Sequence, residues 1–194
     1  MTTAPGAEPD AVTGTWTINP IASHVTFAVH YALLGTIRGR FTDLEGLLDL
    51  HPDITRCSAM LLIDAASVHT GPPAQDHWLR SAAFLDADTY PHIWFHSTEV
   101  ARHPNGRRGH ALVTGELTIR DVTRPVRCAV QLRRVHADNG HTARVELTGR
   151  TRLSRADFGV GIGHDTRRGG ILLGDRLTLD LDLCAVRERV VPSR

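Results

Sequence analysis

The segment from Ile171 to Leu183 ends in a strict alternation of apolar and polar residues. Leu177, Leu179, Leu181 and Leu183 are separated by Thr178, Asp180 and Asp182. Successive side chains of a β-strand point to opposite faces, so this pattern predicts an antiparallel strand with one buried face and one hydrated face. The same rhythm recurs along most of the chain. We therefore expect a mainly β protein whose function lies in what its sheet encloses.

Composition limits both the fold and the function. The 194 residues, 41% of them hydrophobic and 22% charged, are enough to bury one core, which predicts a single domain. A net charge of +1 gives no general attraction to nucleic acid or to an anionic membrane. All 22 basic residues are arginine, which excludes a lysine Schiff base and a Walker-type phosphate loop.

The three cysteines, Cys57, Cys128 and Cys184, are odd in number and far apart, which predicts reduced thiols in the core rather than a disulfide framework or a structural zinc site. Residues 1–14 contain no apolar stretch typical of a signal peptide, and no later window is long enough to span a bilayer. We expect a soluble cytoplasmic protein with a flexible tail over residues 1–14, a barrel domain over 15–188 and a short tail over 189–194.

About eight strands are predicted, which suits a sandwich or an up-and-down barrel. One segment departs from the β pattern, because residues 73–83 carry apolar residues at helical spacing after a Gly-Pro-Pro break, and they predict a short helix. Asn-Gly turns at residues 104–106 and 138–140 predict hairpin loops. The expected strands are Thr15–Ile18, His24–Tyr31, Ile37–Leu50, Arg56–Asp64, His92–Val100, Gly109–Ile119, Val126–Val135, Ala143–Leu153 and Ile171–Val186.

Compact catalytic motifs are absent from the sequence. Asp157-Phe158-Gly159 matches a kinase triplet, but the chain lacks lysine and the kinase glycine loop, and no Gly-x-Ser-x-Gly elbow occurs. The twelve histidines show neither His-Glu-x-x-His nor another chelating pattern. We therefore predict no metal site and no cofactor.

An ordered set of short motifs nevertheless resembles the YceI-like family, the bacterial polyisoprenoid-binding proteins, from about Trp16 to Arg187. The residues that carry the resemblance are Ser23-x-Val25-x-Phe27, Ile37-Arg38-Gly39-Arg40-Phe41, Thr70-Gly71, Asp76, Leu79-Arg80-Ser81, Phe84-Leu85-Asp86, Tyr90-Pro91-x-Ile93-x-Phe95-x-Ser97-Thr98, the run from Gly115 to Val126, Arg155-x-Asp157-Phe158-Gly159, and the run from Gly169 to Asp175.

The resemblance implies an all-β fold, an eight-stranded antiparallel lipocalin-like barrel with a short helical insertion near one mouth. It also implies binding of an elongated apolar ligand inside the barrel, a polyisoprenoid, an isoprenoid quinone or a similar lipid, for sequestration or carriage. A barrel of this strand number has room for one small ligand. Arg38, Arg80 and Arg155 are candidates for a phosphate or another polar head group, or else for structural ion pairs with Asp76 or Asp157.

The residues expected to contact the ligand follow from the same resemblance. They are Phe27, His30, Tyr31, Ile37, Arg38, Phe41, Asp76, Trp78, Arg80, Phe84, Phe95, Arg155, Phe158 and Ile162. The chain departs from the family pattern at several polar positions, among them Trp78, where the family usually has histidine. These departures predict a ligand that is less polar or differently shaped.

A second hypothesis is an enzyme on the same barrel, a cyclase or isomerase of specialised metabolism. In that case His30, Tyr31 or Asp76 would transfer the proton while the barrel imposes a shape on the substrate. The expected partner in both hypotheses is an apolar small molecule, with no nucleic acid and no stable insertion into a membrane. A homodimer is compatible with both.

Overall fold

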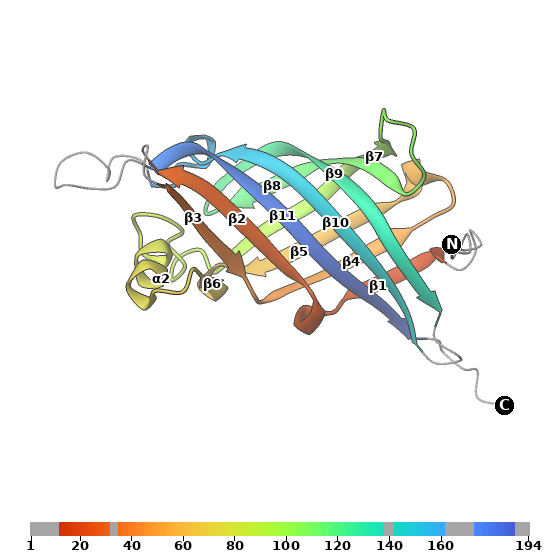
Figure 1. Ribbon diagram of the computed structural model, residues 1–194, viewed down its shortest axis with the longest axis horizontal. Coiled ribbons are helices and arrows are strands. Elements are labelled where there is room, and N and C mark those ends of the chain that lie inside the picture. Colours follow the sequence, from red (N-terminus) through yellow and green to blue (C-terminus); the bar gives the residue numbers. More distant parts are fainter. Residues whose placement is uncertain (1–11, 32–34, 138–141, 162–172, 189–194) are drawn as a thin grey trace.

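The computed structural model describes residues 12–31, 35–137, 142–161 and 173–188, and it shows long antiparallel strands wrapped into a barrel with a short helix beside one end (Figure 1). The elements are β1 Gly14–Ile18, β2 His24–Tyr31, β3 Gly35–Phe41, β4 Leu44–Leu50, β5 Ser58–Asp64, β6 Val68–His69, α2 Pro73–Arg80, β7 His92–Arg102, β8 His110–Ile119, β9 Val122–Ala137, β10 Thr142–Ser154 and β11 Leu173–Glu188. Short 3₁₀ turns lie at Pro20–Ala22, Ile54–Arg56, Ala65–Ser67 and Ala156–Phe158.

The strands close on themselves, which confirms the predicted barrel. Their order is β1-β4-β5-β7-β8-β9-β10-β11-β2-β3-β6, and β1 also pairs with β11. The consecutive pairs β1/β2, β3/β4 and β5/β6 are halves of bent strands, so the barrel has 8 antiparallel strands. Both predicted hairpins are present, β7 with β8 and β9 with β10, although residues 138–141 of the second loop lie outside the described residues.

One predicted strand is divided in two. The run Ile37–Leu50 was expected to be continuous, but the chain turns at Thr42 and Asp43 between β3 and β4. Ser67 holds this corner, because its hydroxyl accepts a hydrogen bond from the Thr42 N–H at 3.2 Å and its carbonyl accepts one from the Thr42 hydroxyl at 3.4 Å. The bend between β3 and β4 and the bend between β5 and β6, where Ser67 lies, therefore stabilise each other.

One end of the barrel is filled by side chains. Trp16 is completely buried there, together with Val145 and Ala185. The Trp16 indole N–H donates to the carbonyl of Val12 at 2.8 Å, and the Arg187 guanidinium lies 4.6 Å from the ring centroid. This packing leaves space for a ligand only toward the opposite end.

Helix α2 lies near that opposite end, beside β3 and β6 (Figure 1). Pro73 occupies its first turn, where the missing N–H costs no hydrogen bond, and Pro72 before it prevents an earlier start. The helix ends at Arg80, three residues before the predicted end, because the Ser81 N–H already closes the last turn on the carbonyl of Trp78.

Other predictions concern the termini and the cysteines. The expected tails lie almost wholly outside the described residues, and Gly14, assigned to the first of them, already belongs to β1. All three cysteines are free, as predicted. None of the helices in the described ranges has the length and apolar character that a membrane crossing requires.

Candidate functional site

An apolar cavity of about 130 Å³ lies inside the barrel at the end near α2. Of the nineteen described residues that line it, eighteen are apolar, and the other is Arg155. The apolar lining residues are Val25, Phe27, Val29, Phe41, Ile63, Val68, Leu79, Phe84, Leu85, Ile93, Leu117, Ile119, Leu153, Phe158, Val160, Leu173, Leu177 and Leu179. Such a lining takes hydrocarbon and offers no acid or base to a substrate.

The alternation seen in the sequence explains how the strands build this lining. Leu177 pairs with Val29, and Leu179 pairs with Phe27, so these inward residues of β11 and β2 form facing pairs in the wall. The intervening Thr178 and Ala28, which pair with each other, point outward. The alternation of inward and outward side chains therefore places these apolar residues around the cavity.

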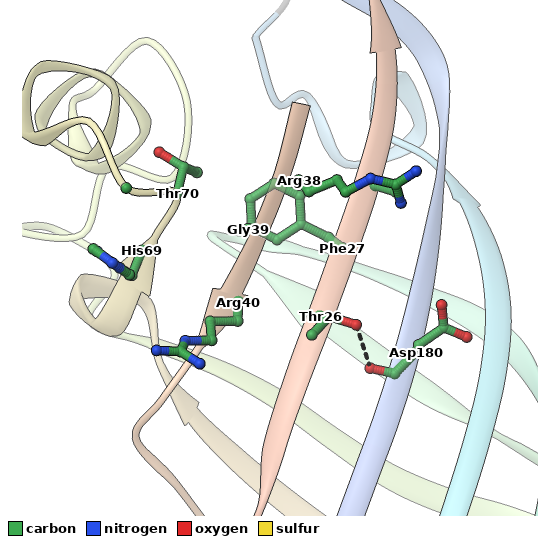
Figure 2. A pocket seen from close by; sticks show the side chains of 10 residues that line it. Thr26, Phe27, Arg38, Gly39, Arg40, His69, Thr70 and Asp180 are labelled. Carbon is green, nitrogen blue, oxygen red and sulfur yellow. Dashed lines mark hydrogen bonds between the residues drawn. The ribbon is translucent and has the colours of Figure 1, made fainter. Parts of the chain in front are cut away.

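A second, larger pocket of about 480 Å³ lies on the outside of the barrel, between β3 and the segment that leads from β6 to α2 (Figure 2). The polar residues of its lining come from β2, β3, β6 and β11 and from the loop after β6. Among the described residues, Phe27 alone lines both this outer pocket and the cavity. The outer pocket is lined by Thr26, Phe27, Ala28, Arg38, Gly39, Arg40, His69, Thr70, Gly71 and Asp180.

Phe27 reaches both spaces because it faces a glycine. Phe27 pairs with Gly39 across β2 and β3, and a Cβ at Gly39 would lie only 2.4 Å from the Phe27 ring. Figure 2 shows the ring lying against β3 at this position. A glycine is therefore required beneath the ring, and the same hypothetical Cβ would come within 2.7 Å of the Thr70 methyl group.

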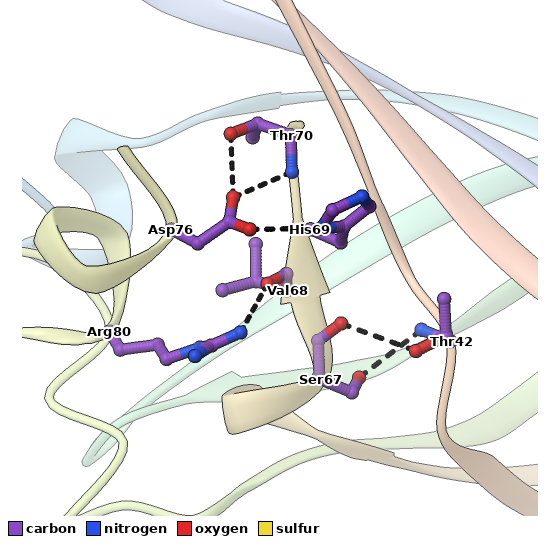
Figure 3. Close-up of polar contacts among 7 residues, drawn as sticks. All are labelled: Thr42, Ser67, Val68, His69, Thr70, Asp76 and Arg80. Carbon is purple, nitrogen blue, oxygen red and sulfur yellow. Dashed lines mark hydrogen bonds and ion pairs between the residues drawn. The ribbon is translucent and has the colours of Figure 1, made fainter. Parts of the chain in front are cut away.

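The outer edge of this pocket is anchored by a buried carboxylate (Figure 3). Asp76 on α2 is only 5% exposed, and its Oδ1 accepts hydrogen bonds from the Thr70 N–H at 2.7 Å and the Thr70 hydroxyl at 2.6 Å. Its Oδ2 accepts one from His69 Nδ1 at 2.9 Å. The Thr70 hydroxyl contributes most to lowering the pKa of Asp76 below its usual value, so the carboxyl stays ionised at neutral pH. Arg80 supports the same corner by donating to the carbonyl of Val68 at 2.9 Å.

The mouth of the barrel is plugged above the cavity. Phe84 and Phe158 are each 2% exposed, and the Trp78 ring packs on Phe84 with the ring centroids 3.9 Å apart. The Gly161 N–H donates to the carbonyl of Ala83 at 3.1 Å and ties the two covering segments together. The segment after α2 and the segment after β10 thus form a cover over this end of the barrel.

Arg155 fixes this cover from below. Its guanidinium donates to the carbonyls of Val160 and Gly161, both at 2.9 Å, of Leu173 at 3.0 Å and of Gly174 at 3.1 Å. Five donors in a planar fork suit this role better than the single ammonium of a lysine. The group therefore joins the segment after β10 to the start of β11.

The residues predicted from the sequence fall into several groups. Those that line the cavity are Phe27, Phe41, Phe84, Arg155 and Phe158. Arg38 lies on the outer surface, in the outer pocket, and Asp76 and Arg80 fasten α2. Ile37 is buried, whereas Phe95 packs over Gly115; neither lines a pocket.

The histidine candidate lies apart from the cavity lining. His30 is exposed, and its Nδ1 shares a hydrogen bond of 2.9 Å with the Thr36 hydroxyl. Tyr31 is the last residue of β2, and Ile162 lies outside the described residues. Over the described parts of the chain, no three His, Cys, Asp or Glu side chains gather in a way that could hold a metal ion.

Sequence reasoning missed most of the aliphatic lining and most of the outer pocket. The inward positions on each strand could have been found by extending the alternation seen in β11, as Leu177 and Leu179 illustrate. No comparable signal marks His69 and Asp180, because they line one pocket only once β11, β2, β3 and β6 are placed in that order in the sheet.

Comparison with known proteins agrees with this geometry. A profile of the YceI-like domain matches residues 16–185. UPF0312 proteins are 30% identical in Vibrio campbellii, over 71% of this chain and 72% of theirs, and 32% identical in Serratia proteamaculans, over 70% and 69%.

Solved structures share the fold. Burkholderia cenocepacia BcnA superimposes with a TM-score of 0.72 and 26% identity, covering 86% of this chain and 98% of BcnA. The Campylobacter jejuni YceI protein gives a TM-score of 0.70 with 19% identity, over 82% and 90% of the two chains. A polyisoprenoid binding domain from Saccharophagus degradans, implicated in plant cell wall breakdown, gives 0.65 with 18% identity, over 88% and 97%. The match over nearly the whole barrel shows that this chain belongs to the YceI-like family.

Proposed function

We propose that this protein binds an elongated apolar ligand, a polyisoprenoid, an isoprenoid quinone or a similar lipid, inside its barrel and thereby sequesters or carries it. The observation that carries the proposal is the internal cavity with eighteen apolar lining residues. Each methylene group moved from water into such a lining contributes about 0.8 kcal/mol to binding. The polyisoprenoid binding named for the Saccharophagus degradans relative supports the same ligand class.

The lining favours binding over proton transfer. Arg155 is the one titratable residue among the described lining residues, and its guanidinium donates to four backbone carbonyls. His30 and Asp76, which the enzyme hypothesis requires, line no part of the described cavity. Nothing in the geometry therefore favours the cyclase or isomerase alternative. A cytoplasmic location and a homodimer stay predictions.

Native mass spectrometry of the freshly purified protein, followed by organic extraction, tests the proposal. We expect a stoichiometric apolar adduct with a long tail. Leu177→Trp should fill the cavity and abolish the adduct, at a cost of about 1–3 kcal/mol in stability from overpacking.

Thr178→Trp is the matched control, because the next residue of β11 points to the outer face and should leave the adduct unchanged. A folded wild-type protein that carries no adduct and binds no added C20 isoprenoid would contradict the proposal. An adduct retained by Leu177→Trp would place the ligand elsewhere.

A further inference from the structure

The cavity is too small for the ligand it is proposed to hold. Its volume of about 130 Å³ is close to that of an engineered cavity of about 150 Å³ that binds benzene, whereas most ligand pockets measure about 300–1,000 Å³. The outer pocket, of about 480 Å³, is separated from the cavity by the Phe27 ring. Movement of that ring would join the two spaces into one of ordinary ligand size.

The mouth of the barrel is a poor route to the cavity. A ligand entering there would have to displace Phe84 and Phe158 and break the hydrogen bonds that Arg155 donates to the carbonyls around it. Hydrogen bonds from a charged donor are roughly twice as strong as those between neutral groups. The side of the barrel offers a route without such a loss.

The side route exists because β6 is very short. It pairs with β3 only at Arg40–His69 and Phe41–Val68, so Gly39 and the residues before it have no strand partner on that side. Gly71, with φ of 106°, and the two prolines that follow turn the chain away into α2. The resulting gap, between the β3 edge and Thr70, is where the outer pocket lies.

A single side chain closes this gap from the inside. The Phe27 ring lies over Gly39, lines both spaces and packs against Phe41 with the ring centroids 5.8 Å apart. Rotation of this one side chain away from Gly39 would open the gap. The opposite edge is held in place by the hydrogen bonds between Thr70 and Asp76. The gap thus combines a rigid frame with one movable ring.

The charges in the outer pocket indicate which end of a ligand stays outside. Arg38 and Arg40 are exposed there, and neither guanidinium has a hydrogen-bond or ion-pair partner among the residues that the structure describes. The carboxylate of Asp180 is already bound by Arg150, whose Nε donates to its Oδ1 at 2.5 Å. Two unpaired guanidinium groups next to an apolar interior fit a phosphate or diphosphate head with a hydrocarbon tail.

We propose that the gap between β3 and Thr70 is the entrance for the ligand, that Phe27 is its gate, and that Arg38 and Arg40 bind the phosphate or diphosphate head of an isoprenoid whose tail lies in the barrel. This inference rests on the proposed function and adds the route and the head group.

Stopped-flow binding of geranylgeranyl diphosphate, followed by tryptophan fluorescence, tests the gate. Phe27→Ala should raise the association and dissociation rates together by about tenfold or more, while the dissociation constant changes far less, because a gate limits both directions of passage. Phe95→Ala is the matched control: Phe95 also lies over a glycine, with a hypothetical Cβ at Gly115 2.5 Å from its ring, but it lines neither pocket. Unchanged rates in Phe27→Ala, or equal increases in Phe95→Ala, would overturn the gate.

The head-group site is tested by comparing geranylgeranyl diphosphate with geranylgeraniol and with inorganic pyrophosphate. The double variant Arg38→Gln/Arg40→Gln should weaken binding of the diphosphate about tenfold or more and leave the alcohol unchanged. Arg127→Gln/Arg152→Gln removes the same charge from exposed positions on β9 and β10 outside the pocket and should change neither.

Two results would overturn the head-group site. One is pyrophosphate binding as tightly as the whole lipid, which would indicate a site for a free anion; the other is equal weakening in both double variants, which would indicate only an effect of net charge. If the wild type binds neither the diphosphate nor the alcohol, the proposed function itself fails. If it binds both and the variants behave as wild type, only the entrance is wrong.

Discussion

The carboxylate of Asp76 binds Thr70 twice, through its backbone N–H at 2.7 Å and its hydroxyl at 2.6 Å. The two residues are six positions apart and lie on opposite sides of the Gly-Pro-Pro turn that starts α2. Because Asp76 is almost fully buried, these bonds are shielded from water, and they determine where the edge of the outer pocket lies.

Removing this carboxylate should destabilise the barrel. We expect Asp76→Ala to lower the free energy of unfolding by about 1.5–3 kcal/mol, the value of hydrogen bonds to a charged group. Asp53→Ala is the matched control, because Asp53 bonds the N–H and hydroxyl of Thr55 in the same way, at 3.1 and 2.8 Å, but is exposed. Urea unfolding should show a clearly smaller loss for Asp53→Ala; equal losses would show that burial adds nothing.

The same contact predicts a pH dependence. Hydrogen bonds from Thr70 lower the pKa of Asp76 in the folded protein below its ordinary value of 3.8, so its contribution is fully present above that value and is lost as the pH falls through the lowered pKa. The stability difference between the wild type and Asp76→Ala should therefore shrink as the pH falls below about 4. Urea titrations between about pH 5 and pH 3 measure it, and a difference that grows over that range would contradict the assignment.

Arg155 should be needed for its shape rather than its charge. Arg155→Lys keeps the charge but cannot reach the four carbonyls that the guanidinium binds, so we expect a loss of at least about 1.5–3 kcal/mol in the free energy of unfolding. Arg152→Lys, at an exposed position near the end of β10, should cost little. Arg155→Lys could instead unfold like the wild type and lose affinity only for geranylgeranyl diphosphate. That result would show that Arg155 binds the head group of the ligand and that its bonds to the backbone carbonyls do not stabilise the fold.

The barrel could be predicted from the sequence because its signal is local and repeated. Alternation of the kind seen from Leu177 to Leu183 needs only neighbouring residues, and turn residues mark most strand ends. The break between β3 and β4 could not be predicted in this way, since it depends on Thr42 meeting Ser67, a residue of another bent strand.

The site was less predictable than the fold, for the same reason. Arg38 and Arg155 are alike in the sequence, yet one is unpaired on the outer face and the other binds backbone carbonyls beneath the mouth. The period of two places Arg38 opposite Ala28 on the outside, but it cannot show that β6 ends after two residues and leaves a gap there. The chain path after β6 decides which arginine is free to bind a ligand.

The aromatic cover should contribute to ligand retention. Trp78 is not among the described lining residues of the cavity but packs on Phe84, which is, and the pair contributes about 0.5–1.5 kcal/mol beyond its buried area. Trp78→Ala should lower the melting temperature and speed the loss of bound geranylgeraniol from the barrel. His30→Ala, which removes an exposed side chain bonded only to Thr36, should change neither. If His30→Ala instead abolishes turnover of an added substrate while ligand binding survives, the enzyme hypothesis is favoured and the carrier hypothesis is wrong.

Thiol chemistry reports whether the barrel opens. Burial raises the pKa of Cys128 to about 11, so only about one molecule in a thousand carries its reactive thiolate at pH 8. Burial also raises the pKa values of Cys184 and Cys57, but Cys57, which lies just before β5, is only half-buried and easier to reach. With Ellman's reagent at pH 8 we expect one thiol to react in the native protein and three after guanidinium is added. The variant Cys57→Ser should lose the native reaction entirely; a fast native reaction that survives in it would show that the interior is exposed in solution without unfolding.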